Sequence, residues 1–534
     1  MIKIKRALIS VSDKTGVVDF AAALERHGCE IISTGGTRKT LEEAGIRVTD
    51  ISAVTGNPEA FGGRMKTISF QIESALLFDR EKDAEEAEKL GIRPIDMVVC
   101  NLYPFDKVRA KGAGLPELIE NIDIGGPTMV RAAAKNYAYV ATVVDPYDYP
   151  VLLNELTEHD GALCKETRFR LMRKAFNHTA DYDALIATTM DEQAGEISVR
   201  LAFDRAKTLR YGENAHQQAA FLRERGANSS YYDMDVLHGK ELSYNNMVDM
   251  YAALESVRDM RQHACAVIKH ANPCGLATGD DQSKVLEYAW QGDPVSAFGS
   301  VIAFNTTLTR ETVEFFALDA EDRSKRKFVE IVAAPAFTPE ALAYLQLHKN
   351  LRIVKFDPHF LVPEKDMKIL HHSLLLQDTD VKNKDRIEAK TTHVKDMDAE
   401  LLDFGLKCVR QLKSNAICIV RKTPAGDCQL LGMGCGQPNR LNSTELSIKR
   451  CRENLRNEWD GEGDVQAYIE EKISECILFS DAYFPFSDNV ELAHAAGIRT
   501  IVQPGGSIRD KDVISKAEEL GVGMIFTGVR HFKH

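Results

Sequence analysis

The pair Lys269-His270 closes a short apolar stretch, Ala264–Ile268, and the chain turns at once through Asn272-Pro273. Adjacent residues on a strand point to opposite faces, but a turn at the strand end lets both side chains reach one pocket. A histidine with a pKa near neutrality suits proton transfer, and a nearby lysine stabilises negative charge. A hydrogen-bonded structural histidine beside a solvated lysine fits the same pattern, so both interpretations stay open here.

Three loops near the N-terminus share a second pattern, in which a strand is followed by Gly, Ser or Thr and then by a helix start. They cover residues 10–16, 33–37 and 123–128. Glycine lets the backbone approach an anion, hydroxyls donate hydrogen bonds, and a helix N-terminus presents free N–H groups. Basic residues lie on or near these loops: Lys14, Arg64, Lys66 and Lys135. The pattern fits a phosphate site and also ordinary strand-to-helix turns, while P-loop and dinucleotide fingerprints are absent from the sequence.

Two further segments carry side chains that bind anions or move protons. LRYGENAHQ contains Arg210, Tyr211 and His216, and VRHFKH ends the sequence with Arg530 and His534. Each segment fits a binding role or a structural one. Because no polar tail follows VRHFKH, we expect the C-terminus to be docked against the protein.

Length and composition limit the class of protein. A chain of 534 residues exceeds one hydrophobic core, so we expect two to four domains. The net charge of -12 disfavours a nucleic-acid surface, and no apolar run reaches the length of a membrane span. Eleven scattered cysteines without a C-x-x-C pair predict reduced thiols and no metal site. The first residues pass directly into a strand pattern without a signal-peptide core, so we expect a cytoplasmic protein.

Strand and helix patterns alternate through the first 145 residues or so, which predicts an α/β domain with a parallel sheet and helices on both faces. Functional loops should then lie at the carboxyl ends of the strands. A polar stretch around residues 191–200 marks a domain boundary. Beyond it, CAVIKHANPCG is echoed by NAICIVRK, VSAFGSVIAFN by SDAYFPFSDNV, and VEIVAAPAF by RTIVQPGGS. These echoes predict two related subdomains.

Together these stretches carry a family resemblance. SVSDKTG, STGGT, GGRMKT, NIDIGGPTMVRAAAKN, LRYGENAHQ, VIKHANPCG, KSNAI, SDAYFPFSDN and MIFTGVRHFKH occur in this order along the chain. The sequence closely resembles the bifunctional purine-biosynthesis enzymes that join a phosphoribosyl-aminoimidazole-carboxamide (AICAR) formyltransferase to an inosine monophosphate (IMP) cyclohydrolase.

The resemblance implies a fold and an assembly. Residues 1–195 would form a methylglyoxal-synthase-like cyclohydrolase domain. Residues 200–534 would form the formyltransferase, built from two cytidine-deaminase-like subdomains without zinc at roughly 200–370 and 371–534. It further implies a homodimer, 10-formyltetrahydrofolate as cosubstrate, small-molecule nucleotide substrates, and a structural monovalent cation such as potassium as one option.

For formyl transfer, the resemblance places Lys269 and His270 at the reacting centre. We assign proton removal from the amine to His270, positive charge or the leaving-group proton to Lys269, and orientation of the formyl group to Asn415. The nucleotide-binding positions that carry over are Arg210, Tyr211, Asn245, Gly299, Glu330, Arg440, Tyr483, Asp488, Arg530 and His534.

For ring closure, the resemblance places Lys66, Tyr103, Asp123 and Lys135 at the ring. Phosphate and ribose would be held by Ser10, Ser12, Lys14, Ser33, Thr34, Gly35, Thr37, Arg64 and Thr67. One stretch departs from the family: Ile68–Leu77 reads ISFQIESALL where LHPKVHGGIL or similar is usual. We expect this variant loop to form a wall of the pocket. The alternative is a formyltransferase whose N-terminal domain only senses a ligand.

Overall fold

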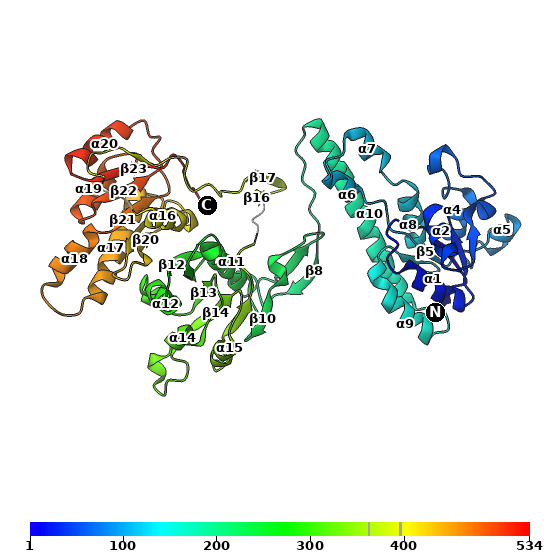
Figure 1. Ribbon diagram of the computed structural model, residues 1–534, viewed down its shortest axis with the longest axis horizontal. Coiled ribbons are helices and arrows are strands. Elements are labelled where there is room, and N and C mark those ends of the chain that lie inside the picture. Colours follow the sequence, from blue (N-terminus) through cyan, green and yellow to red (C-terminus); the bar gives the residue numbers. More distant parts are fainter. Residues whose placement is uncertain (361–363, 395–397) are drawn as a thin grey trace. The chain divides into compact units, whose positions relative to one another are not determined.

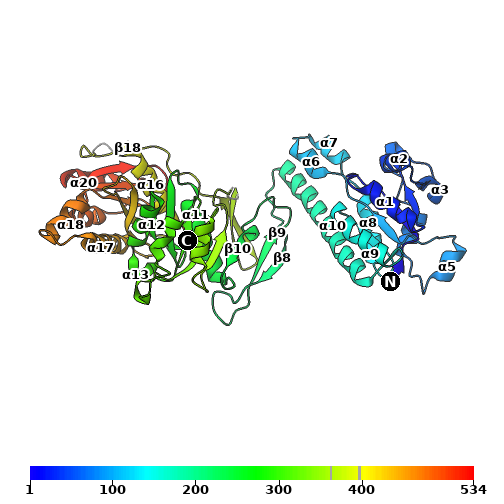
Figure 2. The ribbon, with the colours of Figure 1, turned by 60° about the horizontal axis from the view of Figure 1, so that its bottom comes forward.

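The computed structural model describes residues 1–360, 364–394 and 398–534, and the chain divides into two units, Met1–Ala202 and Phe203–His534. Both units are α/β (Figures 1 and 2). The polar stretch predicted as a boundary, residues 191–200, covers the last four residues of the last helix of unit 1 and the segment that follows it, and unit 1 ends at residue 202. No described helix has the length and apolar character needed to cross a membrane.

Unit 1 consists of seven short strands and ten α-helices. Its strands are β1 (Ile2–Lys3), β2 (Arg6–Ile9), β3 (Glu30–Ser33), β4 (Val48–Asp50), β5 (Met97–Val99), β6 (Ala141–Val143) and β7 (Ala162–Leu163). Its helices are α1 (Val17–Arg26), α2 (Gly35–Glu43), α3 (Ile51–Thr55), α4 (Phe70–Leu77), α5 (Ala84–Lys89), α6 (Phe105–Ala110), α7 (Leu115–Glu120), α8 (Gly125–Lys135), α9 (Tyr149–Glu158) and α10 (Lys165–Ala194).

The central sheet of unit 1 has the order β4-β3-β2-β5-β6, and every neighbouring pair is parallel. Strand residues alternate between two cores: Leu8 of β2 enters one, while Ala7 and Ile9 enter the other. Helices cover both faces, with α1 and α9 on one and α4 and α8 on the other. The predicted parallel sheet with helices on both faces is therefore confirmed.

Unit 2 is dominated by one long sheet. Its strands are β8 (Phe203–Thr208), β9 (Ala220–Glu224), β10 (Asp235–His238), β11 (His263–Lys269), β12 (Asn272–Gly279), β13 (Ser300–Phe304), β14 (Val329–Ala334), β15 (Arg352–Lys355), β16 (Lys365–Leu370), β17 (Ser373–Asp378), β18 (Glu388–Ala389), β19 (Ile417–Lys422), β20 (Cys428–Gly434), β21 (Ile477–Ser480), β22 (Thr500–Gln503) and β23 (Gly523–Phe526). Its helices are α11 (Tyr244–Arg258), α12 (Gln282–Gln291), α13 (Pro294–Ala297), α14 (Arg310–Val313), α15 (Pro339–Leu345), α16 (Ala399–Gln411), α17 (Arg440–Glu458), α18 (Val465–Ser474), α19 (Asp488–Ala495) and α20 (Asp510–Glu519).

The sheet of unit 2 repeats one pattern twice. Its order is β10-β15-β14-β13-β11-β12 and then β20-β19-β21-β22-β23-β18, so the halves mirror each other about the β12–β20 pair. Corresponding neighbours also share parallel or antiparallel sense, as in β13–β14 and β21–β22. The internal duplication is thus visible in the topology. One predicted echo was wrong, because the counterpart of β13 is β21, whereas SDAYFPFSDNV begins only at the last residue of β21.

One hydrophobic core spans both halves of this sheet. Helices α11 and α16 lie on the same face and contribute to one cluster, for example through Leu254 and Val409. The opposite face carries two separate cores, one for each half. The face covered by α11 and α16 therefore ties the halves together. The cysteines are all free thiols, as predicted.

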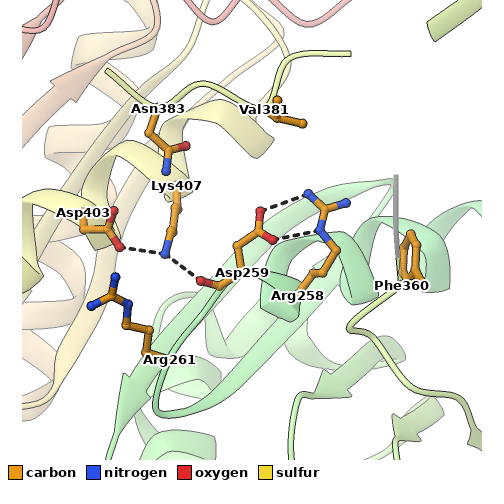
Figure 3. A pocket seen from close by; sticks show the side chains of 8 residues that line it. All are labelled: Arg258, Asp259, Arg261, Phe360, Val381, Asn383, Asp403 and Lys407. Carbon is orange, nitrogen blue, oxygen red and sulfur yellow. Dashed lines mark hydrogen bonds and ion pairs between the residues drawn. The ribbon is translucent and has the colours of Figure 1, made fainter. Parts of the chain in front are cut away.

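Charged residues join α11 to α16 beside a cavity of about 470 Å³ (Figure 3). Asp259 accepts hydrogen bonds from Arg258 Nε and Nη2, both at 3.0 Å, and from Arg410 Nη2 at 2.9 Å. Lys407 Nζ donates to the Asp259 carbonyl at 2.6 Å and pairs with Asp403 at 2.6 Å. The charged residues around this cavity therefore join the end of α11, in the first half of unit 2, to α16, in the second half. We call this set of contacts the Asp259 clamp.

Replacing Asp259 tests the clamp. The hydrogen bonds from Arg258, and the charges of Arg258 and Arg410, lower the pKa of Asp259 to about 2. Its stabilising contribution is therefore complete above the ordinary carboxyl pKa and is lost as pH falls toward 2. Because this side chain is 40% exposed, we expect Asp259→Asn to lower the unfolding free energy by only about 1 kcal/mol at pH 7. Urea unfolding from pH 7 to 3 should show this difference shrinking below about pH 4; a difference that grows toward low pH would contradict the clamp.

Candidate active sites

The carboxyl ends of three parallel strands meet at one edge of unit 1. The loops after β2 and β5 are tied by Asn101, whose Oδ1 accepts from the Ser12 and Asp13 amides at 2.6 and 2.9 Å. The strand order reverses between β2 and β5, because β3 and β4 lie on one side and β6 on the other. Open α/β sheets bind ligands at such a switch point.

Two lysines approach the N-terminus of α2 at this edge. A Cβ on Gly35 would lie 3.8 Å from Lys66 Nζ, and a Cβ on Gly36 would lie 3.8 Å from Lys14 Nζ. Thr34, Gly35 and Lys66 also line a cavity of about 460 Å³. Free N–H groups and two ammonium groups at one helix start can hold a phosphate.

Some predicted phosphate ligands have structural partners instead. Ser33 and Thr37 are buried, and their hydroxyls donate to the carbonyls of Ile9 and Val11 at 2.6 and 3.0 Å. These bonds fix β3 against the end of β2, and α2 against the loop after β2. Ser10 and Ser12 are half-buried on that loop, so their hydroxyls remain the more accessible of the four.

Asp123 precedes α8 and is the strongest candidate for proton transfer in unit 1. Its carboxylate accepts from the Gly126 amide at 2.8 Å and from the Tyr103 amide at 3.4 Å. Burial raises the pKa of this carboxyl, whereas those N–H groups and the charge of Lys66 lower it. Asp123, Lys66 and the backbone of Tyr103 are thus brought together, as the resemblance implies.

Three other predicted residues of unit 1, Thr67, Arg64 and Lys135, have surroundings that differ from those of Asp123. Thr67 is buried, and its Oγ1 would lie 2.7 Å from a Cβ on Gly125 at the start of α8. Arg64 is exposed and faces Glu120 at 3.9 Å. Lys135 stands in the last turn of α8, ten residues after Gly125 and so about 15 Å along the helix axis. Among the described residues, no hydrogen bond or ion pair joins Lys135 to Asp123.

The variant stretch Ile68–Leu77 is not a loop. Residues Phe70–Leu77 form α4, because Ser69 Oγ accepts from the Ile72 amide at 3.1 Å and Ile72, Ala75 and Leu76 bury one face. Burial raises the pKa of Glu73 on this helix, and its Oε1 has no hydrogen-bond partner among the described residues. Sequence reasoning missed both features.

In unit 2, Lys269 and His270 lie at the tip of the β11–β12 hairpin. Lys269 Nζ donates to the Phe298 and Gly299 carbonyls at 3.1 and 2.9 Å, so one ammonium N–H remains for a ligand. Gly299 has φ 69°, and a Cβ there would lie 3.3 Å from Lys269 Nζ. Gly299 is therefore required for the close approach of Lys269 to the start of β13.

The tip of the β11–β12 hairpin also contacts the second half of unit 2. Asn272 Nδ2 donates to the His270 carbonyl at 2.9 Å, and Asn272 Oδ1 accepts from the Lys413 amide at 3.4 Å. Lys413 is followed by Ser414-Asn415, which precede β19. The structure thus brings the Lys269-His270 turn beside the segment that carries Asn415.

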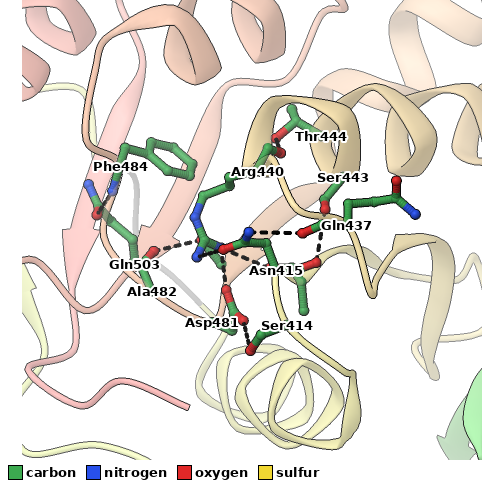
Figure 4. A network of polar contacts seen from close by, with 12 residues as sticks. Ser414, Asn415, Gln437, Arg440, Ser443, Thr444, Asp481, Ala482, Phe484 and Gln503 are labelled. Atoms are coloured by element: carbon green, nitrogen blue, oxygen red, sulfur yellow. Dashed lines mark hydrogen bonds and ion pairs between the residues drawn. The ribbon is translucent and has the colours of Figure 1, made fainter. Parts of the chain in front are cut away.

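Asn415 and Arg440 belong to a polar network with Asp481 (Figure 4). The Asn415 amide nitrogen donates to the Gln437 and Pro438 carbonyls at 2.9 and 3.1 Å, and its Oδ1 accepts from Arg440 Nη2 at 2.8 Å. Arg440 is buried and paired with the fully buried Asp481. Both donors of the Asn415 amide are thus committed, and Arg440 acts as a strut of the network.

The remaining predicted nucleotide ligands lie on exposed or half-buried surface. Tyr211 O accepts from the Tyr244 amide at 3.3 Å, which joins the LRYGENAHQ segment to the start of α11. Asn245 on α11 donates to the Glu213 carbonyl at 3.1 Å. Glu330 pairs with Arg352 at 2.6 Å on the first half. Tyr483 and Asp488 are exposed near the start of α19 on the second half.

The C-terminus is docked, as predicted. His531 is buried, with Nδ1 2.8 Å from Asp380 Oδ2. Lys533 accepts from the Ser414 amide at 2.9 Å, and its own amide donates to Ser414 Oγ at 3.1 Å. Arg530 and His534 are exposed, each beside Phe532. The last residues therefore hold Ser414, the neighbour of Asn415.

No group of three or more His, Cys, Asp or Glu within the described ranges could hold a metal ion.

Comparison with known proteins gives two matching family models. The model described as AICARFT/IMPCHase bienzyme matches residues 133–450, and the MGS-like domain matches residues 16–128. Two curated relatives are named bifunctional purine biosynthesis protein PurH. The one from Ruminiclostridium cellulolyticum is 43% identical over 99% of this chain and 100% of its own length. The one from Bacillus mycoides is 44% identical with the same coverage.

Proposed function

Because the chain belongs to the AICARFT/IMPCHase bienzyme family, we propose that unit 2 transfers the formyl group and that unit 1 closes the ring. The protein is a bifunctional AICAR formyltransferase and IMP cyclohydrolase, and it catalyses the last two steps of purine biosynthesis. Its formyl donor is a folate. The relatives match along both units, which favours two activities over a formyltransferase with a sensing module.

Formyl transfer requires a proton to leave a poor nucleophile. The 5-amino lone pair of AICAR is delocalised into an imidazole that bears a carboxamide, so attack on the formyl carbon needs the amine proton removed. The developing oxyanion and the departing folate nitrogen need positive charge or a proton. The contact that carries the proposal is Asn272 to Lys413, which unites the Lys269-His270 turn with the Asn415 segment.

We assign the proton of the amine to His270, directly or through the substrate carboxamide. Lys269, held by two carbonyls, directs its third N–H at the formyl oxygen or the leaving nitrogen. The resemblance has Asn415 orient the formyl group, but its amide N–H groups are already used. We therefore give Asn415 Oδ1 the role of accepting from the substrate amine, with Arg440 fixing its orientation.

The nucleotide would lie across the surface that joins the two halves. Arg210, Tyr211 and Asn245 approach from the first half, while Tyr483, Asp488, Arg530 and His534 approach from the second. Gly299 contributes by leaving room for the Lys269 side chain. Glu330 contributes indirectly, through its ion pair with Arg352. Exposed Arg530 supplies charge for the phosphate.

Ring closure joins two groups of one molecule, because the carboxamide nitrogen attacks the formyl carbon and water then leaves. The protein mainly needs to hold the near-attack geometry and move protons. Asp123, a carboxyl whose pKa is raised by burial, moves the proton, and Lys66 stabilises the oxyanion. Lys14 and the start of α2 hold the phosphate, with Tyr103 at the rim of the site, 42% exposed. The role of Lys135 rests on the resemblance alone.

Four finer points belong to the same proposal. The donor is 10-formyltetrahydrofolate, the chain forms a homodimer, and the reactions take place in the cytoplasm; these follow from the resemblance and the chemistry. Only the resemblance supports a bound potassium ion. The buried carboxylate of the Asn415 network, Asp481, gives no support for a cation there because it is already paired with Arg440.

Replacing His270 separates the two activities. We expect His270→Ala to lower formyl transfer by about 100-fold or more, because a general base is lost. Ring closure of supplied formylated intermediate should stay at the native rate, since its residues belong to unit 1. Steady-state rates of both steps provide the measurement, with His371→Ala, an exposed histidine, as the control. Equal loss of both activities in a folded variant would refute the assignment to two units.

Replacing Lys66 tests ring closure despite the variant α4. We expect the native protein to close the ring far faster than buffer, and Lys66→Ala to be slower by about 100-fold, because oxyanion stabilisation is lost. Lys89→Ala removes an exposed charge on α5 and serves as the control. Native closure at the buffer rate would mean that unit 1 is not catalytic, and an unchanged Lys66→Ala would remove this residue from the mechanism.

Removing residues 530–534 tests the docked terminus. The deletion takes away the partners of Ser414 and the charge of Arg530, so we expect the nucleotide KM of formyl transfer to rise about tenfold or more. Far-UV circular dichroism and the urea unfolding midpoint report on folding of unit 2, and ring closure should stay native because its residues belong to unit 1. A truncated protein with native KM would show that the C-terminus only covers the fold.

A further inference from the structure

The turn between β11 and β12 has an unusual backbone. His270 and Ala271 have φ of 51° and 56°, a left-handed conformation that residues with a side chain rarely adopt. Hairpins with two such central residues usually carry Asn-Gly there. Since neither His270 nor Ala271 favours this geometry, contacts from outside the hairpin must hold it.

The main outside contact comes from Asp249 on α11. Its Oδ1 accepts from the Ala271 amide at 2.7 Å, and the His270 backbone also interacts with this carboxylate. Lys269 pairs with Asn272 across the hairpin, so the amides between them point away from the strand ladder. Asp249 thus satisfies a donor that the left-handed turn leaves without a partner in the sheet.

Helix α11 is well placed to hold the turn. Its start is fixed by a capping box, in which Ser243 Oγ accepts from the Asn246 amide and Asn246 Oδ1 accepts from the Ser243 amide. Asn245 lies four residues before Asp249 and so on the same side of the helix. The side of α11 that meets the LRYGENAHQ segment therefore also meets the catalytic turn.

Two basic side chains and a tyrosine lie near this carboxylate. The titratable groups that face Asp249 are Lys269 and His270 on the hairpin and Tyr231 on the short helix before β10. Burial raises the pKa of Asp249, while the Ala271 amide and the charges of His270 and Lys269 lower it. The carboxylate of Asp249 thus lies near the two side chains that formyl transfer uses, Lys269 and His270.

We propose that Asp249 is a positioning residue for formyl transfer, which holds the Lys269-His270 turn in its left-handed form and balances the charge of the protonated imidazole. This inference rests on the proposed role of His270. It assigns Asp249 no contact with the substrate.

Two substitutions separate the effects of shape and charge. Asp249→Ala removes the acceptor, and we expect kcat of formyl transfer to fall about 100-fold while the nucleotide KM changes less than threefold, since a small displacement of reacting groups has this cost. Asp249→Asn keeps an acceptor and removes the charge. We expect a smaller loss of kcat, about tenfold, because the turn keeps its acceptor while the negative charge beside His270 is removed.

A rescue experiment identifies the turn as the route of the effect. Glycine adopts the left-handed conformation freely, so Ala271→Gly should restore at least about tenfold of the activity lost in Asp249→Ala. The urea unfolding midpoint of unit 2 in each variant controls for folding, and Glu287→Gln on α12 controls for charge. Native kcat in Asp249→Ala, or a loss of kcat that Ala271→Gly does not relieve, would overturn the role of Asp249 in holding the turn. Native kcat in Asp249→Asn would overturn its role in balancing charge. Native formyl transfer in His270→Ala would instead overturn the proposed role of His270.

Discussion

The pairing of β12 with β20 is the interaction on which the rest of unit 2 depends. It is short, with Ala277 opposite Gln429 and Thr278 opposite Cys428, yet it is the only place where the two halves of the long sheet share a strand ladder in the described chain. Its antiparallel sense brings the tip of one hairpin beside the segment that enters the other. The shared core under α11 and α16 and the Asp259 clamp stabilise this arrangement. Neither half alone contains both the Lys269-His270 turn and Asn415.

Unit 1 brings its site residues together through its parallel sheet, without a repeat of the fold. Its parallel strands all end at one edge, so loops distant in sequence converge there without any repeat of the fold. Asn101 shows how this works, because one side-chain amide after β5 fixes the loop after β2. The edge then offers a helix start with two lysines and, nearby, the half-buried carboxyl of Asp123, which are the kinds of group that a reaction within one molecule needs.

The sequence predicts the regular part of this structure well. Alternating strand and helix patterns predict the sheet of unit 1, and the echo of CAVIKHANPCG in NAICIVRK predicts the repeat, since β11 and β19 occupy equivalent positions. The sequence does not show which polar side chains are free to bind a ligand and which form hydrogen bonds that hold the fold together. Ser33, Thr37 and Arg440 have the residue types of a binding site, but their partners are buried groups distant in sequence. Asp249 and Asn101 were missed for the same reason, because no local pattern shows which turn a carboxylate or amide will meet. The cap of α4 at Ser69, by contrast, is a local signal that was available.

The two reactions differ in how strictly they need such support, and the structure reflects that difference. Formyl transfer brings together two molecules, so its rate depends on turn geometry that the backbone does not favour by itself: two left-handed residues, a glycine that admits Lys269, and a docked C-terminus. Ring closure begins with its reacting atoms already linked. Residues 70–77 can then differ from the usual family sequence and form the helix α4, because the groups that move charge lie outside it. Lys66 Nζ lies near the start of α2, and Asp123 accepts from the Gly126 amide at the start of α8. The polar contacts around the Lys269-His270 turn thus fit one physical distinction between the reactions. Formyl transfer must bring two molecules together in a set orientation, whereas ring closure needs one molecule held in a reactive conformation.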